Sequence, residues 1–154
     1  GPDGYLTITD RKKDLIVTAG GKKIAPQPLE NQLKADLLIA EAVLVGERRK
    51  FPAALIVPDF PKLESWALAR GVVAGSREAL VAHPDVQKRY QQTLDGVNRT
   101  LAQFERIKRF AVLPTEFTME RGELTPTMKV RRQVVEERWR AVIDELYATF
   151  PAPS

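Results

Sequence analysis

Apolar and polar residues alternate in two short stretches near the start of the chain. Residues 5–9 alternate between polar and apolar side chains, and residues 15–18 are a second β-rich run. These patterns predict two short strands, with the polar segment 10–14 between them as a turn or hinge. Gly20 and Gly21 are predicted to end the second strand, because paired glycines permit backbone angles and close approaches that a side chain forbids.

An amphipathic helix and a hairpin are predicted next. The segment from Pro28 has a proline suitably placed in the first turn and carries leucines at helical spacing, namely Leu29, Leu33 and Leu37. Residues 41–45 and 53–57 are short apolar runs rich in Val, Ile and Leu. They predict two strands joined around the turn 46–51 as a hairpin.

Helical spacing returns in the second half of the chain. One short helix, containing Leu63, Trp66 and Ala67, is predicted to end at Gly71, and residues 76–82 add a further turn or two. The helix from Pro84 presents one continuous apolar face, which we interpret as a core face: Val86, Tyr90, Leu94, Val97, Leu101 and Phe104.

The last third of the chain is predicted to contain a strand, a loop and a final helix. Residues 109–113 form the strand, and the loop 114–128 contains Gly122 and Pro126. The final helix ends at Pro151 and places these residues on one side: Val130, Val134, Trp139, Val142, Leu146 and Phe150.

The mixture of helices and strands predicts an α+β fold. Short antiparallel strands, including the hairpin, would pack against amphipathic helices, without a regular βαβ alternation. A chain of 154 residues with 44% hydrophobic and 29% charged residues matches one globular domain. No apolar run approaches the roughly 18 residues of a membrane span, and no secretory-signal pattern is present. Gly1 and Pro2 resemble a protease-cleavage remnant and are excluded from the fold prediction.

The amino-acid composition excludes several kinds of catalytic and metal site. The chain has no cysteine and one histidine, His83, so it offers no Cys-His pair and no multi-histidine zinc site. His83 precedes Pro84 and Asp85 at a predicted helix start, which favours a structural role. A formal net charge of +4 suits a polyanionic partner such as a nucleotide, CoA, nucleic acid or anionic lipid, although most charge runs are solvated surfaces.

Three segments carry a resemblance to a known family. They are Gly4 to Pro26 (GYLTITDRKKDLIVTAGGKKIAP), Glu41 to Pro58 (EAVLVGERRKFPAALIVP) and Gly122 to Arg132 (GELTPTMKVRR). In this order they resemble the hinge, the hairpin and the closing motif of the C-terminal domain of the adenylate-forming superfamily. The first segment has the form typical of long-chain fatty acid-CoA ligases, and the match spans nearly the whole chain.

The resemblance implies a two-step reaction. A fatty acid carboxylate would attack the α-phosphate of Mg-ATP to give acyl-adenylate and pyrophosphate, and the CoA thiol would then displace AMP. ATP, CoA and Mg²⁺ would serve the full-length enzyme, with the Mg²⁺ site in a large N-terminal AMP-binding domain expected upstream of Asp3. The present chain would be the small mobile lid that rotates between an adenylating and a thioester-forming pose, and by itself it is expected to be inactive.

The resemblance also implies roles for particular residues. Lys129 matches the adenylation lysine. Lys13 matches the hinge position, with Lys12 as the runner-up, and Arg11 resembles an arginine near the nucleotide, with a surface salt bridge as its alternative. A turn containing Gly20 and Gly21 would line the CoA tunnel in the thioester-forming pose.

Two further patterns are excluded or absent. Residues 20–23 are not a phosphate-binding P-loop, because the required glycine five positions before the Gly-Lys pair is replaced by Ile16. Some relatives carry a second functional lysine after the hinge strand, where this chain has Val17. No metal-binding residues are predicted in this chain.

The predicted organisation is a hinge segment at 3–14, the lid at 15–150 and a tail at 151–154. One alternative is the lid of a fatty acyl-AMP ligase, which passes the adenylate to a carrier protein. Another is a basic nucleic-acid-binding domain, although the chain lacks the recognition motif and aromatic platform of such modules. A cytoplasmic location is expected, and the positive charge would also favour peripheral association with an anionic membrane.

Overall fold

The computed structural model describes residues 15–148. The predicted strand at 5–9, the hinge candidates Lys12 and Lys13, and Arg11 lie outside the described residues. The predicted end of the last helix, at Phe150 and Pro151, also lies outside them.

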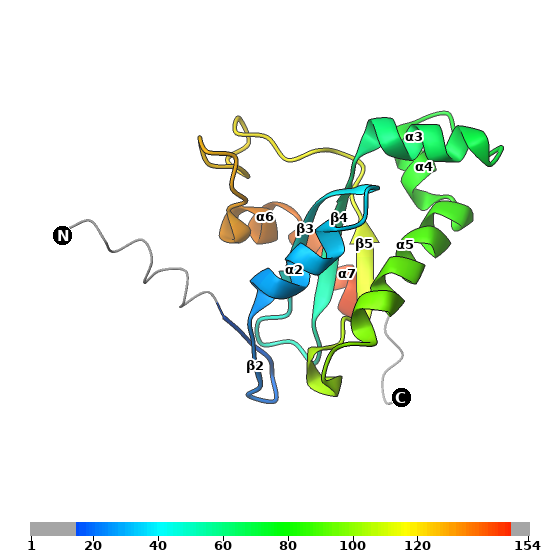
Figure 1. The fold of residues 1–154 in the computed structure, drawn as a ribbon. Helices are drawn as coiled ribbons and strands as arrows, with labels where there is room; N and C mark the ends of the chain where they lie inside the picture. Colours follow the sequence, from blue (N-terminus) through cyan, green and yellow to red (C-terminus); the bar gives the residue numbers. More distant parts are fainter. Residues whose placement is uncertain (1–14, 149–154) are drawn as a thin grey trace.

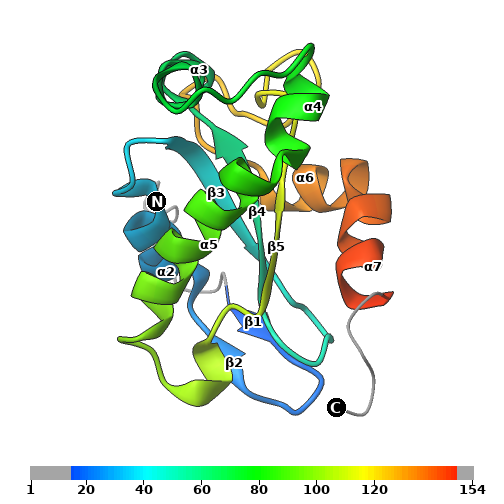
Figure 2. The same cartoon turned by 90° about the vertical axis from the view of Figure 1, so that its right-hand side faces the viewer.

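A three-stranded sheet forms the middle layer of the domain (Figures 1 and 2). Its order is β3 (Ile39–Val45), β4 (Ala53–Pro58) and β5 (Arg109–Val112). The predicted hairpin is confirmed, because β3 and β4 pair antiparallel. β5 pairs parallel to β4, so the expectation of antiparallel strands does not hold for this pair. A parallel partner requires a long crossover connection, and here several helices supply it.

Helices cover both faces of this sheet. α2 (Pro26–Lys34) and α5 (Pro84–Asn98) lie on one face, and α6 (Arg132–Arg138) and α7 (Arg140–Ala148) lie on the other (Figure 2). Alternate residues of β4 enter two separate cores, with Ile56 facing α2 and α5 and Leu55 facing α6 and α7. Burial on both faces explains why the strands read as continuous apolar runs. The predicted α+β fold is therefore confirmed.

Side-chain caps fix the helices of the crossover, α3 (Phe60–Ala69) and α4 (Arg77–Ala82), and the start of α5. Asp59 and Ser76 accept hydrogen bonds from the backbone N–H groups of the first turns of α3 and α4. His83 Nδ1 accepts from the Asp85 N–H at 3.1 Å, as expected for a structural histidine at a helix start. No helix within residues 15–148 has the length and apolar character to span a bilayer.

Two predicted helix ends are wrong. α2 begins at Pro26 and ends at Lys34, so Leu37 lies beyond it and is 72% exposed. α5 ends at Asn98, and a short 3-10 helix, η1 (Gln103–Glu105), follows it. Phe104 therefore leaves the predicted apolar face and is exposed.

The predicted final helix is two helices. α6 ends at Arg138 and α7 begins at Arg140, with Trp139 at the break between them. Val130 is not helical, since it forms an isolated antiparallel bridge with Leu124. Tertiary contacts of Trp139, described below, account for the break.

Candidate functional site

Lys129 lies on a tight turn whose backbone is held from both sides. The Thr125 N–H donates to the Lys129 carbonyl at 2.8 Å, and the Lys129 N–H donates to Thr125 Oγ1 at 3.0 Å. Met128 adopts a left-handed conformation, with φ of 66°, and its N–H donates to the Thr125 carbonyl. Below this turn the Leu124–Val130 bridge closes a short ladder. The backbone of Lys129 is therefore fixed, although the residue is exposed.

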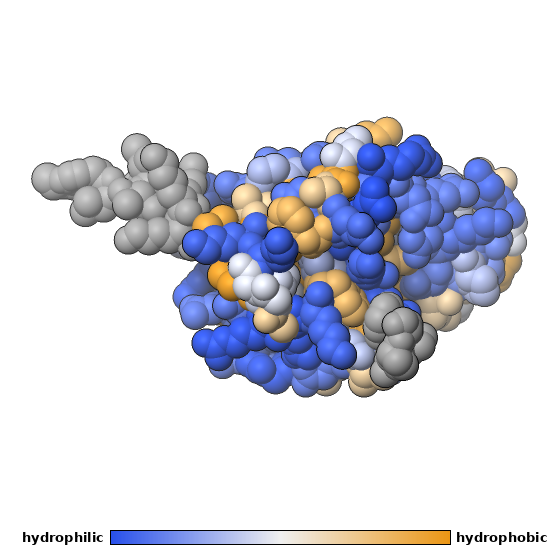
Figure 3. Space-filling view, turned by 90° about the horizontal axis from the view of Figure 1, so that it is seen from below, coloured by the Kyte–Doolittle hydropathy of each residue, from blue (hydrophilic) through white to orange (hydrophobic). Residues whose placement is uncertain are grey.

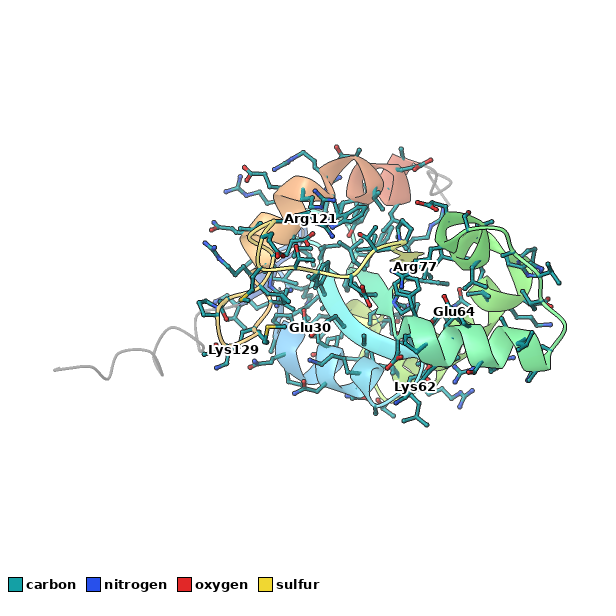
Figure 4. All side chains as sticks on the ribbon, turned by 90° about the horizontal axis from the view of Figure 1, so that it is seen from above. Glu30, Lys62, Glu64, Arg77, Arg121 and Lys129 are labelled. Carbon is teal, nitrogen blue, oxygen red and sulfur yellow. The ribbon has the colours of Figure 1, made fainter. Side chains whose placement is uncertain are left out.

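The Lys129 side chain extends from this turn to the outer edge of the domain. Figure 4 shows it on the opposite side from Lys62 and Arg77 of the α3 and α4 region, with Glu30 lying inward from it on α2. No residue of the described range 15–148 forms an ion pair or a hydrogen bond with its ammonium. The ammonium is therefore available to a partner outside this range.

A groove of about 710 Å³ lies beside this turn, between α2, β3 and α6. It carries both signs of charge, with Lys34, Lys129 and Arg131 against Glu30 and Glu136. Its other lining residues are Gln27, Asn31, Glu41, Ala42, Val43, Met128, Val130, Arg132, Gln133 and Val134. The lysine thus stands at the rim of a polar concavity.

Arg132, three residues after Lys129, joins α6 to α2 and β3. Its Nη1 donates to Glu30 Oε2 at 2.7 Å and to the Leu44 carbonyl at 2.6 Å. The Leu44 N–H in turn donates to Glu30 Oε2 at 2.7 Å. The ion pair therefore satisfies both backbone groups of Leu44 at the free edge of the sheet, where a neighbouring strand would otherwise do so.

Glu123 is fully buried at the start of the turn. Its Oε1 accepts from the Thr118 N–H at 3.1 Å and pairs with Arg121 at 3.4 Å. Its Oε2 accepts from the Trp139 indole N–H and pairs with Arg138 Nε, each at 3.1 Å. Both oxygens of the buried carboxylate therefore have partners, as a buried charge requires.

Sequence reasoning missed the roles of Glu123, Glu30 and Arg132. Glu123 and Arg132 stand inside the quoted closing motif, so their position was a signal. The partners of Arg132 and two of the partners of Glu123, however, come from other elements. Glu30 carried no signal, since an acidic residue on a short amphipathic helix is ordinarily solvated.

Gly20 and Gly21 lie in the turn between β1 (Ile16–Val17) and β2 (Lys23–Ile24), which pair antiparallel. The turn is closed by hydrogen bonds within residues 18–22, and Gly21 has a φ of 83°, a value that favours glycine. The predicted strand-ending turn is confirmed.

The β3–β4 turn forms hydrogen bonds with the β1–β2 hairpin that contains Gly20 and Gly21. The Val17 N–H donates to Glu47 Oε1 at 3.0 Å, and the Arg48 N–H donates to the Val17 carbonyl at 2.8 Å. The Ala19 N–H donates to the Arg49 carbonyl at 2.8 Å. Seen from below, the surface at this end is mostly hydrophilic, with apolar residues in separate patches (Figure 3).

The structure does not bring the two predicted functional segments together. The β1–β2 turn with Gly20 and Gly21 lies at one end of the domain, and the turn with Lys129 lies at the other (Figures 1 and 2). Within residues 15–148 there is no group of three or more His, Cys, Asp or Glu side chains that could hold a metal ion.

Comparison with known proteins identifies relatives of the whole chain. Residues 13–151 match the family described as the AMP-binding enzyme C-terminal domain. The chain is 44% identical over 146 residues to the long-chain-fatty-acid–CoA ligase FadD15 of Mycobacterium tuberculosis, covering 94% of this chain and 24% of the ligase. It is 38% identical over 151 residues to the human long-chain-fatty-acid–CoA ligase 1, covering 96% of this chain and 22% of that protein.

A solved structure has the same fold. The adenylation domain of a carboxylate reductase from Mycobacterium chelonae superposes with a TM-score of 0.65 at 27% identity, covering 89% of this chain and 20% of that one. The present chain therefore spans about a quarter or less of the length of the relatives that it matches.

Proposed function

The chain belongs to the AMP-binding enzyme C-terminal domain family, and from that premise we propose that it is the lid of an AMP-forming long-chain fatty acid-CoA ligase. The substrates would be a fatty acid, ATP and CoA. The curated relatives named above, both ligases of this class, support the choice of substrate class. The chain's own N-terminal AMP-binding domain would be its partner, in keeping with the quarter of each relative that the match covers.

The observation that carries the proposal is the separation of the two predicted functional segments, the turn with Lys129 and the β1–β2 turn with Gly20 and Gly21. A group that acts on ATP and a turn that lines a CoA tunnel must each enter the same cleft, yet the turn that carries Lys129 and the β1–β2 turn lie at opposite ends of one domain (Figures 1 and 2). The domain would present one end for adenylation and then rotate to present the other for thioester formation.

Lys129 would act in the first step. Its ammonium is unpaired within residues 15–148 and its backbone is held by Thr125, so it could stabilise charge that develops on the carboxylate and α-phosphate oxygens. Gly20 and Gly21 would act in the second step, where their lack of side chains leaves room for the CoA arm.

The hinge and nucleotide contacts are proposed from the family resemblance. Lys13 would be the pivot, with Lys12 as the alternative, and Arg11 would approach the ribose and phosphates. In the full-length enzyme, Lys13→Pro would fix φ and slow the two half-reactions by different factors. Equal slowing of both steps would exclude Lys13 as the pivot.

Mg²⁺ would enter with ATP, and the family resemblance implies that its site lies in the N-terminal AMP-binding domain. A cytoplasmic enzyme, peripherally associated with an anionic membrane through its positive charge, would meet both ATP and membrane-partitioned fatty acids.

The test is turnover by the full-length protein. With a long-chain fatty acid, ATP, Mg²⁺ and CoA it should release AMP and form acyl-CoA, and the present chain alone should form none. Acyl-CoA formation by this chain alone, or none by the full-length protein, would contradict the proposal. If the adenylate formed but reacted with a phosphopantetheinyl carrier protein instead of CoA, the acyl-AMP ligase alternative would hold. Nothing in the comparisons favours the nucleic-acid-binding alternative.

A further inference from the structure

Glu123 is buried at the base of the turn that carries Lys129. Among residues 15–148, Thr18 and Glu123 are the two buried polar residues, and only Glu123 has a charged side chain. A carboxylate withdrawn from water is stable only when its oxygens are paired. Here each oxygen has two partners, which come from the segment before the turn and from the junction of α6 and α7.

The second pair of partners explains the helix break. Arg138 Nε and the Trp139 indole N–H both reach Oε2 of Glu123, each at 3.1 Å. Adjacent residues on a continuous α-helix point about 100° apart and do not face a common partner. The interruption at Trp139 lets both side chains converge on the carboxylate, and so ties the α6–α7 junction to the turn.

A short ladder connects Glu123 to Lys129. The Arg131 N–H donates to the Glu123 carbonyl at 2.8 Å, and the Leu124–Val130 bridge and the Thr125–Lys129 hydrogen bond follow in order. Leu124 is buried in the second core, so the base of the ladder is fixed while its tip is exposed. A displacement of Glu123 is therefore transmitted along the ladder to the backbone of Lys129.

We propose that Glu123 is a positioning residue for Lys129: its buried carboxylate, clamped by Arg121, Arg138 and Trp139, sets the place of the lysine for the adenylation step. This inference rests on the proposed function, because it concerns the step in which Lys129 would act. It does not concern thioester formation, for which the opposite end of the domain is presented.

The experiment measures each half-reaction of the full-length enzyme separately. ATP–pyrophosphate exchange reports adenylation, and pre-formed acyl-adenylate with CoA reports thioester formation. Glu123→Gln keeps the size of the side chain but places an amide N–H₂ group among donors. Adenylation should fall by about 10- to 100-fold, the scale of a misplaced catalytic group, and thioester formation should change less than about threefold.

Asp36→Asn is the matched control. Asp36 is another carboxylate with little exposed surface, paired with Arg89 at 2.7 Å, but it lies in the connection between α2 and β3 and has no contact with the Lys129 turn. Its loss should lower stability and leave the ratio of the two half-reaction rates unchanged. If Asp36→Asn changed the ratio of the two half-reaction rates as much as Glu123→Gln does, the effect of Glu123→Gln would be explained by lost stability alone. That result would overturn the proposal.

The double variant Glu123→Gln/Lys129→Ala decides whether Glu123 acts through the lysine. Once Lys129 is absent, Glu123→Gln should slow adenylation by less than about twofold more, because its effect would already be lost. Independent multiplication of the two defects would overturn the proposal and leave the role of Lys129 intact. If Lys129→Ala alone slowed both half-reactions equally, the role of Lys129 would fail and the positioning role with it.

Trp139→Phe provides a second route if Glu123→Gln does not fold. It removes one donor to Oε2 without leaving a charge unpaired, since Arg138 remains. Adenylation should fall by about threefold to tenfold, with thioester formation preserved. Unchanged adenylation in a folded Trp139→Phe enzyme would overturn the clamp as the positioning device.

Discussion

Arg132 and Glu30, which lie 102 residues apart in sequence, form an ion pair of 2.7 Å at the edge of the central sheet. Both side chains also bind the backbone of Leu44. Arg132 donates to the Leu44 carbonyl, and Glu30 accepts from the Leu44 N–H. The pair thus joins α6 to α2. In the sequence α6 follows Lys129, and α2 follows the β1–β2 turn. The two side chains that form this link are far apart in the sequence.

Breaking this pair should cost more than breaking an exposed pair on the same helix. The side chains of Arg132 and Glu30 are 19% and 13% exposed, so Glu30→Gln should lower the free energy of unfolding by about 3 kcal/mol. Lys34→Gln, the control, removes the exposed Lys34–Glu41 pair and should cost no more than about 1 kcal/mol. Urea denaturation followed by circular dichroism measures both, and equal losses would contradict the assigned importance of the pair.

Loss of the Lys129 ammonium should affect one half-reaction. Removal of a single well-placed electrostatic donor slows a step by about 10²- to 10³-fold, so Lys129→Ala and Lys129→Gln should slow adenylation to that extent. Thioester formation from pre-formed acyl-adenylate should proceed at the wild-type rate. Arg131→Gln, a control at an exposed residue of the same groove, should leave adenylation within about threefold. If the thioester step collapsed together with adenylation, the two-pose mechanism would be wrong.

The two glycines of the β1–β2 turn should differ in their tolerance of a side chain. No atom lies within 4 Å of a Cβ added at either position, but only Gly21 has a positive φ, of 83°. Gly21→Ala should therefore lower the unfolding free energy by about 1–2 kcal/mol, and Gly20→Ala by less than about 0.5 kcal/mol. Thermal denaturation tests this difference, and equal effects would contradict it.

Gly20→Ala also separates backbone strain from the proposed tunnel contact. Because it introduces a methyl group without strain, any slowing of thioester formation in the full-length enzyme would come from crowding of the CoA arm. Adenylation measured in the same preparation is the control and should not change. An unchanged thioester rate would place Gly20 outside the tunnel.

The Asp36–Arg89 pair should make stability depend on pH in the acid range. Burial by itself would raise the pKa of Asp36, but hydrogen bonds from Arg89, Thr93 and the Leu38 N–H outweigh it and hold this pKa below its ordinary value. A carboxyl with a lowered folded-state pKa contributes stability above its unfolded pKa of about 3.9 and loses it as pH falls through the folded value.

Wild type and Asp36→Asn should therefore differ in unfolding free energy by about 1–3 kcal/mol at pH 7. The difference should shrink progressively below about pH 4. Denaturation at a series of pH values measures it. A difference that stayed constant from pH 7 to pH 3 would show that the ionised carboxylate is not the source of the stability.

The sequence by itself determined most of the local structure. Apolar runs at 41–45 and 53–57 were sufficient to predict the hairpin, because its strands are adjacent in the chain and their pattern is local. Spacing of Val86, Tyr90 and Leu94 predicted α5, and the resemblance of the closing motif predicts that Lys129 is the adenylation lysine. Helix ends were less predictable, since Leu37 and Phe104 keep the spacing but not the burial.

Only the tertiary structure decided how these elements combine. β5 can pair parallel to β4 because a long crossover, containing α3, α4, α5 and η1, connects them. The last helix breaks at Trp139, where Arg138 and Trp139 both contact Glu123. Two of the partners of Glu123, Arg138 and Trp139, come from the α6–α7 junction, and no periodicity in the local sequence specifies them. A buried carboxylate is stable only where several distant donors converge, so its position depends on the whole fold rather than on its neighbours in the chain.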